Sequence, residues 1–227
     1  MKIRYYFIIF LLLLFIAIES SATIINIPGD YGTIQEGIDI SDDGDTVLVS
    51  HGRYYENLNL NGMNVVVASQ YLFDNDVSHI ENTIIDGSQP VHPDTASCVL
   101  IVSGEDSTAM LCGFTLTGGV GTVWTDIHYN RDYREGGGIL IEFSSPIIKN
   151  NLIIDNEAVD REDVVSAGGG GIRYGDGNPT IQNNVIINNR GLYGAGIVSN
   201  FAAGKIKNNV IYNNTGGADY GGAGIWA

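Results

Sequence analysis

Basic residues are scarce in this chain of 227 residues, which has 11 Lys and Arg against 26 Asp and Glu and a formal net charge of −15. Residues 1–22 carry a net charge of +1, so the chain without them has a charge of −16. A surface this acidic repels phosphate backbones, and we therefore expect no nucleic-acid partner. An acidic surface of this kind is typical of a salt-tolerant extracellular protein.

Cysteine is scarce too, since the chain has only Cys98 and Cys112. In an exported protein two cysteines 14 residues apart allow one disulfide. Two separate buried thiols are the alternative, and the sequence does not decide between them. Two ligands do not make a metal site, so we expect no metal on this pair.

Several catalytic signatures are missing. The sequence has no Gly-x-Ser-x-Gly elbow, no His-Glu-x-x-His motif and no phosphate-binding loop. The four histidines are scattered, with no repeated spacing to one another. The sequence therefore gives no support for a serine hydrolase, a zinc protease or a nucleotide-binding enzyme of these types.

The longest apolar run lies at the N-terminus, from Tyr5 to Ile18, and it follows Lys2 and Arg4. Its 14 residues are fewer than the roughly 20 that a membrane span needs. A basic start, a short apolar core and small residues before Ala22 predict a signal peptide over 1–22. We expect the mature chain to be secreted or at the cell surface, with no membrane span after cleavage.

Glycine is abundant, with 30 residues, and many of them belong to a repeat. Lines that begin with Gly-Gly-Gly-Ile or Gly-Ala-Gly-Ile occupy 136–141, 169–174, 194–199 and 222–227. An Asn-Asn pair follows the isoleucine of each of the first three lines by 11 residues. The distance from that pair to the isoleucine of the next line varies, at 22, 14 and 17 residues. Each repeat thus has a rigid half and a half that accepts insertions.

A fixed repeat predicts a solenoid in which each unit stacks on the one before. The apolar runs are three to five residues long and alternate, and none resembles an amphipathic helix of ten residues. The sequence therefore predicts an all-β parallel β-helix. We expect one domain over 23–227, with a cap at 24–45 and coils from 46–227.

The Asn-Asn pairs fit the bends of such coils, because Asn tolerates the left-handed backbone that a sharp bend requires. We expect the first Asn of each pair to stack, at about 4.8 Å per coil, in a hydrogen-bonded amide ladder. An inward stack of isoleucines should lie beside it. The predicted ladder and stack consist of Asn150, Asn183, Asn208, Ile148, Ile181 and Ile206.

The two ends of the solenoid differ in sequence. Thr33-x-x-Glu36 is a capping box, which predicts a helix over 33–41 that covers the first coil. Ala227 lies inside the fourth glycine line, with no capping element after Ile225. Because an uncovered solenoid end invites aggregation, we expect the natural chain to be longer.

The N-terminal part resembles a known family. Gly29-Asp-Tyr-Gly-Thr-Ile-Gln-Glu-Gly-Ile-Asp-Ile, followed by Asp45-Thr-Val-Leu-Val and Gly52-Arg-Tyr-Tyr-Glu, resembles the opening of pectinesterases and other secreted bacterial proteins of the pectin-lyase-like superfamily. The resemblance covers 24–227 and implies a right-handed parallel β-helix. It does not extend to activity, because the catalytic segments of pectinesterases and polygalacturonases are missing.

The insertions leave the coil after the Asn-Asn pair and return before the glycine line, so stacking should collect them into a wall on one side. They occupy 118–135, 155–168, 188–193 and 213–221. Loops on a rigid scaffold are where function usually lies. The wall contains aromatic residues and four of the nine basic residues that follow residue 22, and these are Trp124, His128, Tyr129, Tyr133, Tyr193, Tyr220, Arg131, Arg134, Arg161 and Arg190.

Two functions fit such a wall. The first is non-catalytic binding of an anionic or neutral polysaccharide, by aromatic stacking and arginine forks. The residues expected to bind are Trp124, His128, Tyr129, Tyr133, Arg161, Arg190 and Tyr193. The alternative without a binding role is that the arginines pair with neighbouring acidic residues on the surface.

The second function is a polysaccharide lyase or glycoside hydrolase acting on uronate-containing glycans. A lyase would use Arg131 or Arg134 as the base, and Ca²⁺ would neutralise the developing charge. A hydrolase would need two carboxylates roughly 5–10 Å apart. The further candidates are Asp132 and Asp126 for catalysis and Asp126, Asp155 and Asp160 for the metal.

Overall fold

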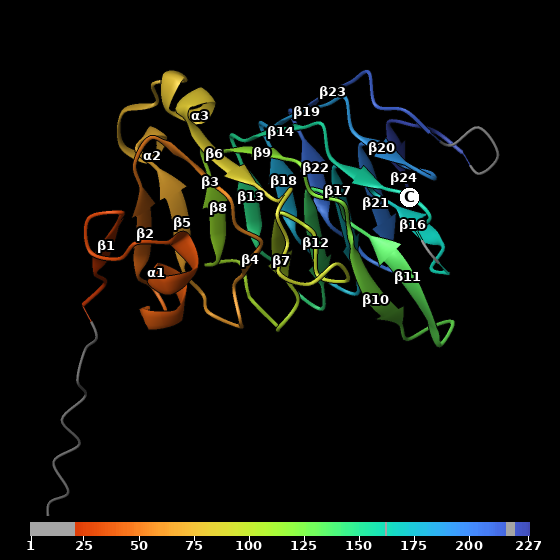
Figure 1. The fold of residues 1–227 in the computed structure, drawn as a ribbon, viewed down its shortest axis with the longest axis horizontal. Coiled ribbons are helices and arrows are strands. Elements are labelled where there is room, and N and C mark those ends of the chain that lie inside the picture. Colours follow the sequence, from red (N-terminus) through yellow and green to blue (C-terminus); the bar gives the residue numbers. More distant parts are fainter. Residues whose placement is uncertain (1–20, 162, 217–220) are drawn as a thin grey trace, which may run out of the picture.

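The structure is a computed structural model that describes residues 21–161, 163–216 and 221–227. The predicted signal peptide, except its last two residues, and Tyr220 of the predicted wall lie outside the described residues. The chain forms a right-handed parallel β-helix whose coils follow one another along the long axis of the molecule (Figure 1). The predicted fold class is confirmed.

Three parallel sheets make up the coils. The first contains β1 (Ile24–Ile27), β2 (Thr46–Val49), β5 (Val66–Ser69), β8 (Met110–Cys112), β13 (Ile147–Lys149), β18 (Thr180–Gln182) and β22 (Lys205–Lys207). The second contains β4 (Leu58–Asn59), β7 (Val99–Ile101), β12 (Ile139–Glu142), β17 (Ile172–Gly175), β21 (Ile197–Asn200) and β24 (Ile225–Trp226). The third contains β3 (Gly52–Tyr54), β6 (Thr83–Asp86), β9 (Thr115–Thr117), β14 (Leu152–Ile154), β19 (Val185–Ile187) and β23 (Val210–Tyr212).

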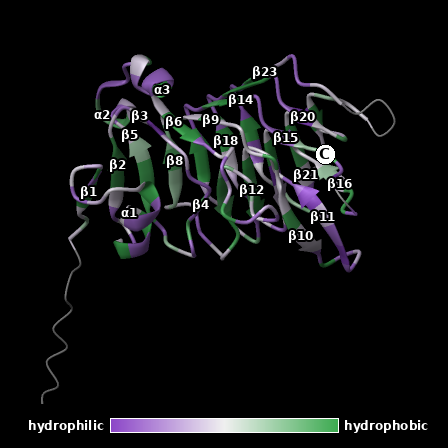
Figure 2. Cartoon of the chain, viewed as in Figure 1, coloured by the Kyte–Doolittle hydropathy of each residue, from purple (hydrophilic) through white to green (hydrophobic). Residues whose placement is uncertain are grey.

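Stacked aliphatic side chains form the core inside the coils. Ile148 pairs with Ile181, and Ile181 pairs with Ile206, as the repeat predicted. Ile148 and Ile181 are fully buried. Each such side chain stabilises the fold by roughly 1.5–3 kcal/mol. Figure 2 shows the apolar residues concentrated in the strands of the coils and polar residues in many of the connections.

The asparagine ladder lies one residue later than predicted. Asn150, Asn183 and Asn208 adopt the expected left-handed backbone, with φ of 55°, 57° and 56°. The second Asn of each pair carries the ladder instead: Asn184 Oδ1 accepts hydrogen bonds from the backbone N and from Nδ2 of Asn151, at 3.0 and 3.2 Å. The bend needs the first Asn for its backbone, and this turns the second side chain inward.

A second ladder runs along another bend of the same coils. Asn189 Oδ1 accepts hydrogen bonds from the backbone N and from Nδ2 of Asn156, and Asn214 Oδ1 does the same for Asn189. Asn156 and Asn189 are buried. The two ladder positions of each coil are five residues apart, as from Asn151 to Asn156 and from Asn184 to Asn189, so no insertion separates the two ladders.

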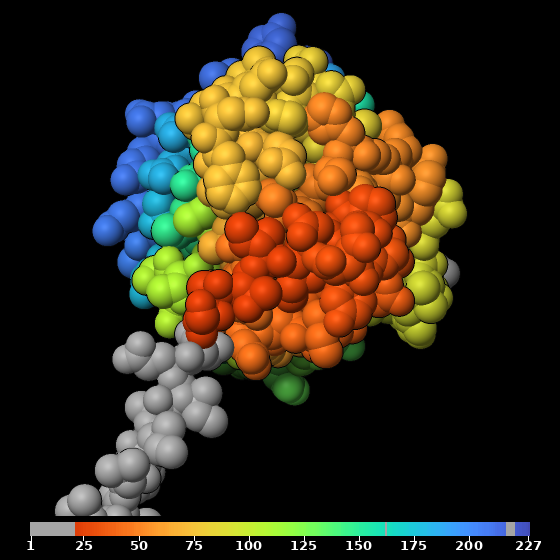
Figure 3. Space-filling view, turned by 90° about the vertical axis from the view of Figure 1, so that its left-hand side faces the viewer, coloured from red at the N-terminus to blue at the C-terminus, as the bar shows by residue number. Residues whose placement is uncertain are grey.

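The N-terminal cap is close to the prediction. Helix α1 (Ile34–Ile40) begins at the N-cap Thr33, and Thr33 and Glu36 form the capping box. Ile34 and Ile38 are fully buried against the first coil. The residues of β1 and α1 lie across this end of the molecule, where Figure 3 shows them in red and orange. Two short helices that were not predicted, α2 (Tyr71–Asp74) and α3 (Ser78–Asn82), decorate the second coil.

Cys98 and Cys112 are free thiols, and both are buried. The alternative of two separate thiols is thus the one that the structure shows. Burial raises the pKa of Cys98 to about 12, so this thiol remains protonated at neutral pH. None of the helices in the described residues has the length and apolar character needed to cross a membrane.

Candidate functional site

The inserted segments pair with one another beside the coils. Strands β10 (Thr122–Asp126) and β11 (Arg131–Glu135) form an antiparallel hairpin. Strand β11 also pairs in parallel with β16 (Ser166–Gly168). Strand β15 (Glu157–Ala158) pairs in parallel with β20 (Arg190–Gly191). In Figure 1 the hairpin lies at the lower right, near β16 and the C-terminal coils. These pairings form the wall that the co-aligned insertions predicted.

A cleft of about 600 Å³ lies between the hairpin, β16 and the last glycine lines. Its lining includes Asp126, Tyr129, Arg131, Tyr133, Asp160, Ser166, Tyr193, Asn200 and Trp226. The Arg131 guanidinium lies over the Tyr133 ring, with its Cζ 5.3 Å from the ring centroid. The Tyr193 and Trp226 rings are 5.0 Å apart and tilted. Burial raises the pKa of Tyr193 to about 12, so its phenol is neutral in this cleft.

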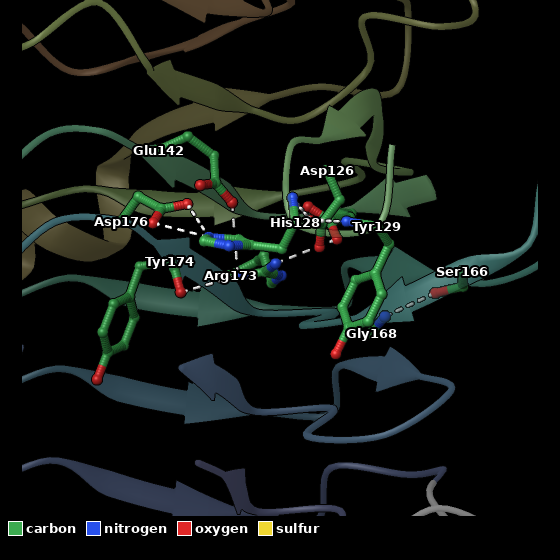
Figure 4. Close-up of polar contacts among 10 residues, drawn as sticks. Asp126, His128, Tyr129, Glu142, Ser166, Gly168, Arg173, Tyr174 and Asp176 are labelled. Carbon is green, nitrogen blue, oxygen red and sulfur yellow. Dashed lines mark hydrogen bonds and ion pairs between the residues drawn. The ribbon is translucent and has the colours of Figure 1, made fainter. Parts of the chain in front are cut away.

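A small crevice adjoins the cleft. Its volume of about 10 Å³ has room for about one water-sized group. Asp126 and Asn200 line both the crevice and the cleft, so the two hollows share a wall. Trp124, His128, Glu142, Arg173 and Asp176 also line the crevice, and Figure 4 shows the last four of these together with Asp126.

A buried arginine lies between two buried glutamates at this place. Arg173 Nη2 is 3.3 Å from Glu135 Oε1, and Arg173 Nη1 is 3.5 Å from Glu142 Oε1. Arg173 Nη1 also donates a hydrogen bond of 2.8 Å to the Tyr174 carbonyl. The three charged side chains are 0–4% exposed. We call these three residues, Glu135, Arg173 and Glu142, the charge cluster.

Burial controls protonation in the charge cluster. Desolvation raises the pKa of Glu142 from 4.5 to about 8, against the opposing attraction of Arg173. Desolvation also raises the pKa of Glu135, and the attraction of Arg173 again opposes this shift. A Glu142 carboxyl that keeps its proton near neutral pH can donate a hydrogen bond or a proton, which an ordinary surface glutamate cannot.

The ends of the glycine lines place these groups. Glu142 pairs with Gly175, and Gly175 pairs with Asn200, across β12, β17 and β21. Gly175 leaves room for the glutamate, because a Cβ there would lie 2.5 Å from Glu142 Oε2. The next residues, Asp176 and Phe201, adopt a left-handed backbone with φ of 49° and 50°. The chain therefore turns sharply and presents both side chains to the hairpin.

The turn of the hairpin is fastened to these two residues. His128 Nε2 lies 2.9 Å from Asp176 Oδ1, and the His128 ring stacks on Phe201 with centroids 3.8 Å apart. Asp126 Oδ1 accepts hydrogen bonds from the backbone N atoms of His128 and Tyr129, at 2.7 and 3.2 Å. Asp126 thus shapes the turn that covers the crevice (Figure 4).

Arg134, one of the two arginines proposed as a catalytic base, does not line the cleft. Arg134 is 2% exposed, and its Nη1 donates hydrogen bonds to the carbonyls of Pro93 and Gly121. Its Nη2 lies 3.1 Å from Asp94 Oδ1. These contacts join the hairpin to the long loop that contains Pro93 and Asp94.

Arg161 and Arg190 do not line this cleft either. Both pair with Glu157, Arg190 at a distance of 3.8 Å. Arg190 lies with Asp155 along a separate groove of about 240 Å³. The alternative that arginines pair with nearby acids therefore describes these two. Arg131 is the predicted arginine that does line the cleft.

The aspartates proposed as metal ligands are also separated. Asp126 and Asp160 line the cleft, whereas Asp155 lines the other groove. Among the described residues, no three or more His, Cys, Asp or Glu side chains are grouped so as to hold a metal ion. Asp132 is exposed and accepts a hydrogen bond of 2.6 Å from Thr125 Oγ1. The structure therefore does not bring these aspartates together into the predicted Ca²⁺ site.

Sequence reasoning missed Glu142, Arg173, Asp176 and Trp226, because it searched the insertions and these residues lie within or just after the repeated lines. One signal was present. Arg173 pairs with Leu140 and Val198, so it is a charged residue at a position that is apolar in the neighbouring coils. A charge at such a position indicates a buried partner or a site.

Comparisons with known proteins found similar crystal structures and a matching family. Two crystal structures of pectin methylesterase in complex with hexasaccharides, one of them a variant, are similar to this chain, each with a TM-score of 0.42 and 12% identity. The matches cover 82% and 83% of this chain, and the chain spans 66% of the length of those proteins. No curated protein sequence matches. Residues 28–224 match the family described as "Protein of unknown function (DUF1565)", and the chain belongs to that family.

Proposed function

We propose that this protein is secreted or displayed at the cell surface and binds polysaccharide in the cleft beside the β10–β11 hairpin. The observation that carries the proposal is the lining of the cleft, where aromatic rings from three separate segments meet. Tyr129 and Tyr133 come from the hairpin, Tyr193 from a later insertion and Trp226 from the last glycine line.

This lining suits a sugar chain. Aromatic faces pack against the apolar faces of sugar rings, while polar groups among them bind hydroxyls. Arg131, Asp126 and Asp160 supply such polar groups here. The cleft volume of about 600 Å³ falls within the range of roughly 300–1,000 Å³ that small-molecule sites occupy. The rigid coils below hold the rings in place, so little ordering is needed on binding.

The proposal of export rests on the basic and apolar pattern of residues 1–22. Mass spectrometry of the protein from the culture medium should give a chain that begins at Thr23. A cytoplasmic protein with Met1 intact would contradict this part of the proposal.

Binding can be tested with a glycan array followed by titration with the best oligosaccharide. We expect Tyr193→Ala to weaken binding about tenfold or more, because a packed aromatic anchor is lost. Tyr212→Ala is the matched control, since Tyr212 is 71% exposed on β23 and does not line the cleft. If neither variant changes the affinity and both keep the wild-type melting temperature, the cleft is not the binding site.

A second candidate function is a glycoside hydrolase with Glu142 as proton donor. The raised pKa of this buried carboxyl favours it, because a general acid must hold its proton at the working pH. The crevice beside Glu142 admits about one water-sized group, so the hairpin turn would have to leave Asp176 and Phe201 before a sugar could reach it. Release of reducing ends by the wild type and not by Glu142→Gln would support hydrolysis. Equal activity of the two would exclude this role.

A further inference from the structure

Acidic residues are missing from two segments of the C-terminal coils, although the chain as a whole has 26 of them. Residues 143–154 contain no Asp or Glu, and neither do residues 177–216. All three lysines that follow residue 22 lie in these two segments, and they are Lys149, Lys205 and Lys207. The charge is therefore unevenly distributed, and a protein with a formal net charge of −15 has a basic region on its last coils.

The lysines share one face of the first sheet. Lys149 pairs with Gln182, and Gln182 pairs with Lys207, across β13, β18 and β22. Their side chains point outward, because these residues alternate with the inward isoleucines of the core. Lys205 lies two residues before Lys207 on β22 and points to the same side. We call this outward surface the lysine face, and it consists of Ile147, Lys149, Thr180, Gln182, Lys205 and Lys207.

The charges of the lysine face are not neutralised by neighbouring acids. In the described part of the chain none of the three lysines forms an ion pair, whereas every arginine except Arg131 pairs with an Asp or Glu. Lys205 and Lys207 are exposed, and Lys149 is half-buried. The ammonium groups are therefore available to an anionic ligand from outside the chain.

The lysine face and the cleft are separate surfaces. The insertions leave the coil after the third sheet and return before the second, so the first sheet forms the side of the coil away from the wall. The residues of the lysine face all lie outside the lining of the cleft. At physiological ionic strength, charges more than about 8 Å apart are largely screened. A ligand on this face is thus governed by the lysines and little affected by the distant acidic residues.

The spacing of the lysines indicates a ligand with repeated anionic groups. Lys149 and Lys207 lie two coils apart along the solenoid, which places their Cα atoms about 10 Å apart. Lys205 and Lys207 lie about 7 Å apart across the solenoid. A small anion meets one or two of these ammonium groups, whereas a chain with an acidic group on successive units meets all three. A lysine ammonium is a point charge on a flexible stem, so it accepts carboxylate and sulfate alike.

We propose that the lysine face binds a linear anionic glycan, one with a carboxylate or sulfate on successive sugars, laid along the axis of the solenoid. The ammonium groups bind the acidic groups through charge-assisted hydrogen bonds, and the Gln182 amide donates to an oxygen between them. This surface is additional to the cleft and does not depend on the function proposed for it. Binding here leaves the cleft open, so one molecule holds an acidic polymer on one side and a second glycan on the other.

The test measures the affinity of the full chain by calorimetry for a dextran sulfate oligomer, a galacturonate oligomer and an uncharged dextran oligomer of equal length. At about 0.15 M salt we expect at least one anionic oligomer to bind about tenfold or more tightly than dextran, since three ion pairs form. At about 1 M salt, where screening acts over about 3 Å, this preference should disappear. The better of the two anionic oligomers identifies the acidic group. Equal affinity for all three, or a preference that salt leaves unchanged, would overturn the inference.

The middle strand of the face supplies variants that suit the fold, because Gln182 occupies the row of Lys149 and Lys207. Lys149→Gln and Lys207→Gln should each weaken the anionic oligomer about threefold and leave the melting temperature unchanged. Arg190→Gln is the matched control, because it removes the same charge from another side of these coils and should change nothing. Gln182→Lys fills the gap in the row and should tighten binding about threefold. If all four variants bind like the wild type, the lysine face is not a binding surface.

Tyr193→Ala separates this inference from the proposed function, because Tyr193 lines the cleft. If Tyr193→Ala weakens the anionic oligomer and the lysine variants do not, the oligomer binds in the cleft alone. The inference is then wrong, and the proposed function stands. If the lysine variants weaken it and Tyr193→Ala does not, the inference holds even where the glycan array finds no ligand for the cleft.

Discussion

The asparagine ladders and the charge cluster are two sets of buried polar groups in the same coils, and they are satisfied to different degrees. Asn184 takes part in the ladder with its backbone N, its Oδ1 and its Nδ2. In the charge cluster, by contrast, Glu135 Oε1 has its ion pair with Arg173 Nη2 but no hydrogen bond, and Arg173 Nε and Glu135 Oε2 have no hydrogen-bond partner among the described residues. The ladder repeats from coil to coil, whereas the charge cluster occurs where the hairpin covers the coils.

This difference separates stability from function. Fully satisfied polar networks hold one register and favour one structure. Incompletely satisfied buried charges oppose folding, and natural proteins keep such violations mainly at functional sites. The charge cluster lies beside the crevice and close to the aromatic cleft. We therefore infer that the regular asparagine ladders serve stability, whereas the irregular charge cluster beside the hairpin serves binding.

The largest expected effect is on stability, from Arg173→Met. The variant leaves Glu135 and Glu142 buried without their cation, and breaking a buried ion pair in this way costs about 3–5 kcal/mol. The loss should be greater at about pH 8 than at about pH 5, because protonation of the glutamates relieves it at low pH. Urea unfolding at the two pH values measures it.

Arg131→Met is the control for this experiment, because Arg131 is exposed on the hairpin and contacts the Tyr133 ring. Its effect on the free energy of unfolding should stay within about 1 kcal/mol. If Arg173→Met changes the free energy no more than the control does, the charge cluster is not an interdependent buried unit.

Asn184→Ala should have the next largest effect. The substitution removes the acceptor of two Asn151 hydrogen bonds and the donor to the Ile148 carbonyl, all of them buried. We expect the free energy of unfolding to fall by about 3 kcal/mol. Asn183→Gly is the neighbouring control, since glycine retains the left-handed backbone at that bend and should change stability by less than about 1 kcal/mol. Equal losses in the two variants would contradict the position of the ladder.

The ladder also shows how far the sequence predicts the fold. The constant spacing from Ile148 to the next coil's Ile181 fixes the register of the strands, because each coil repeats the same bends. The sequence shows that two adjacent asparagines occupy a bend, but it does not show which side chain turns inward. That depends on the backbone: the left-handed residue Asn150 points its side chain away, and Asn151 takes the interior.

The position of the candidate cleft could be predicted from the sequence better than its chemistry could. Co-aligned insertions indicated the hairpin side, and Tyr129, Tyr133 and Tyr193 do line the cleft there. The role of Arg134 depends on Asp94, which is 40 residues away in a long loop that no repeat describes. Long-range ion pairs of this kind follow from tertiary packing and not from local pattern.

A smaller effect should appear in the pH dependence of stability. The folded protein keeps the Glu142 proton up to about pH 8, whereas an ordinary glutamate loses it near 4.5. Between these values the folded state binds one proton more than the unfolded chain does, so this group makes the free energy of unfolding fall as pH rises. The loss is a few kcal/mol at most.

Glu142→Gln should remove this slope, since glutamine does not titrate. Unfolding curves from about pH 5 to about pH 9 compare the variant with the wild type, and Glu81→Gln at an exposed site of α3 serves as the control. A wild-type slope that Glu142→Gln leaves unchanged would show that burial does not raise the pKa of this carboxyl.

The central claim, that glycan binds in the aromatic cleft, has a direct optical test. The chain has two tryptophans, Trp124 beside the crevice and Trp226 in the cleft. In Trp124→Phe the fluorescence comes from Trp226 alone. Titration of this variant with the oligosaccharide that binds best on the glycan array should give a saturable change in Trp226 fluorescence, with the same affinity as calorimetry. Calorimetric binding without any change in Trp226 fluorescence would place the glycan elsewhere and contradict the account.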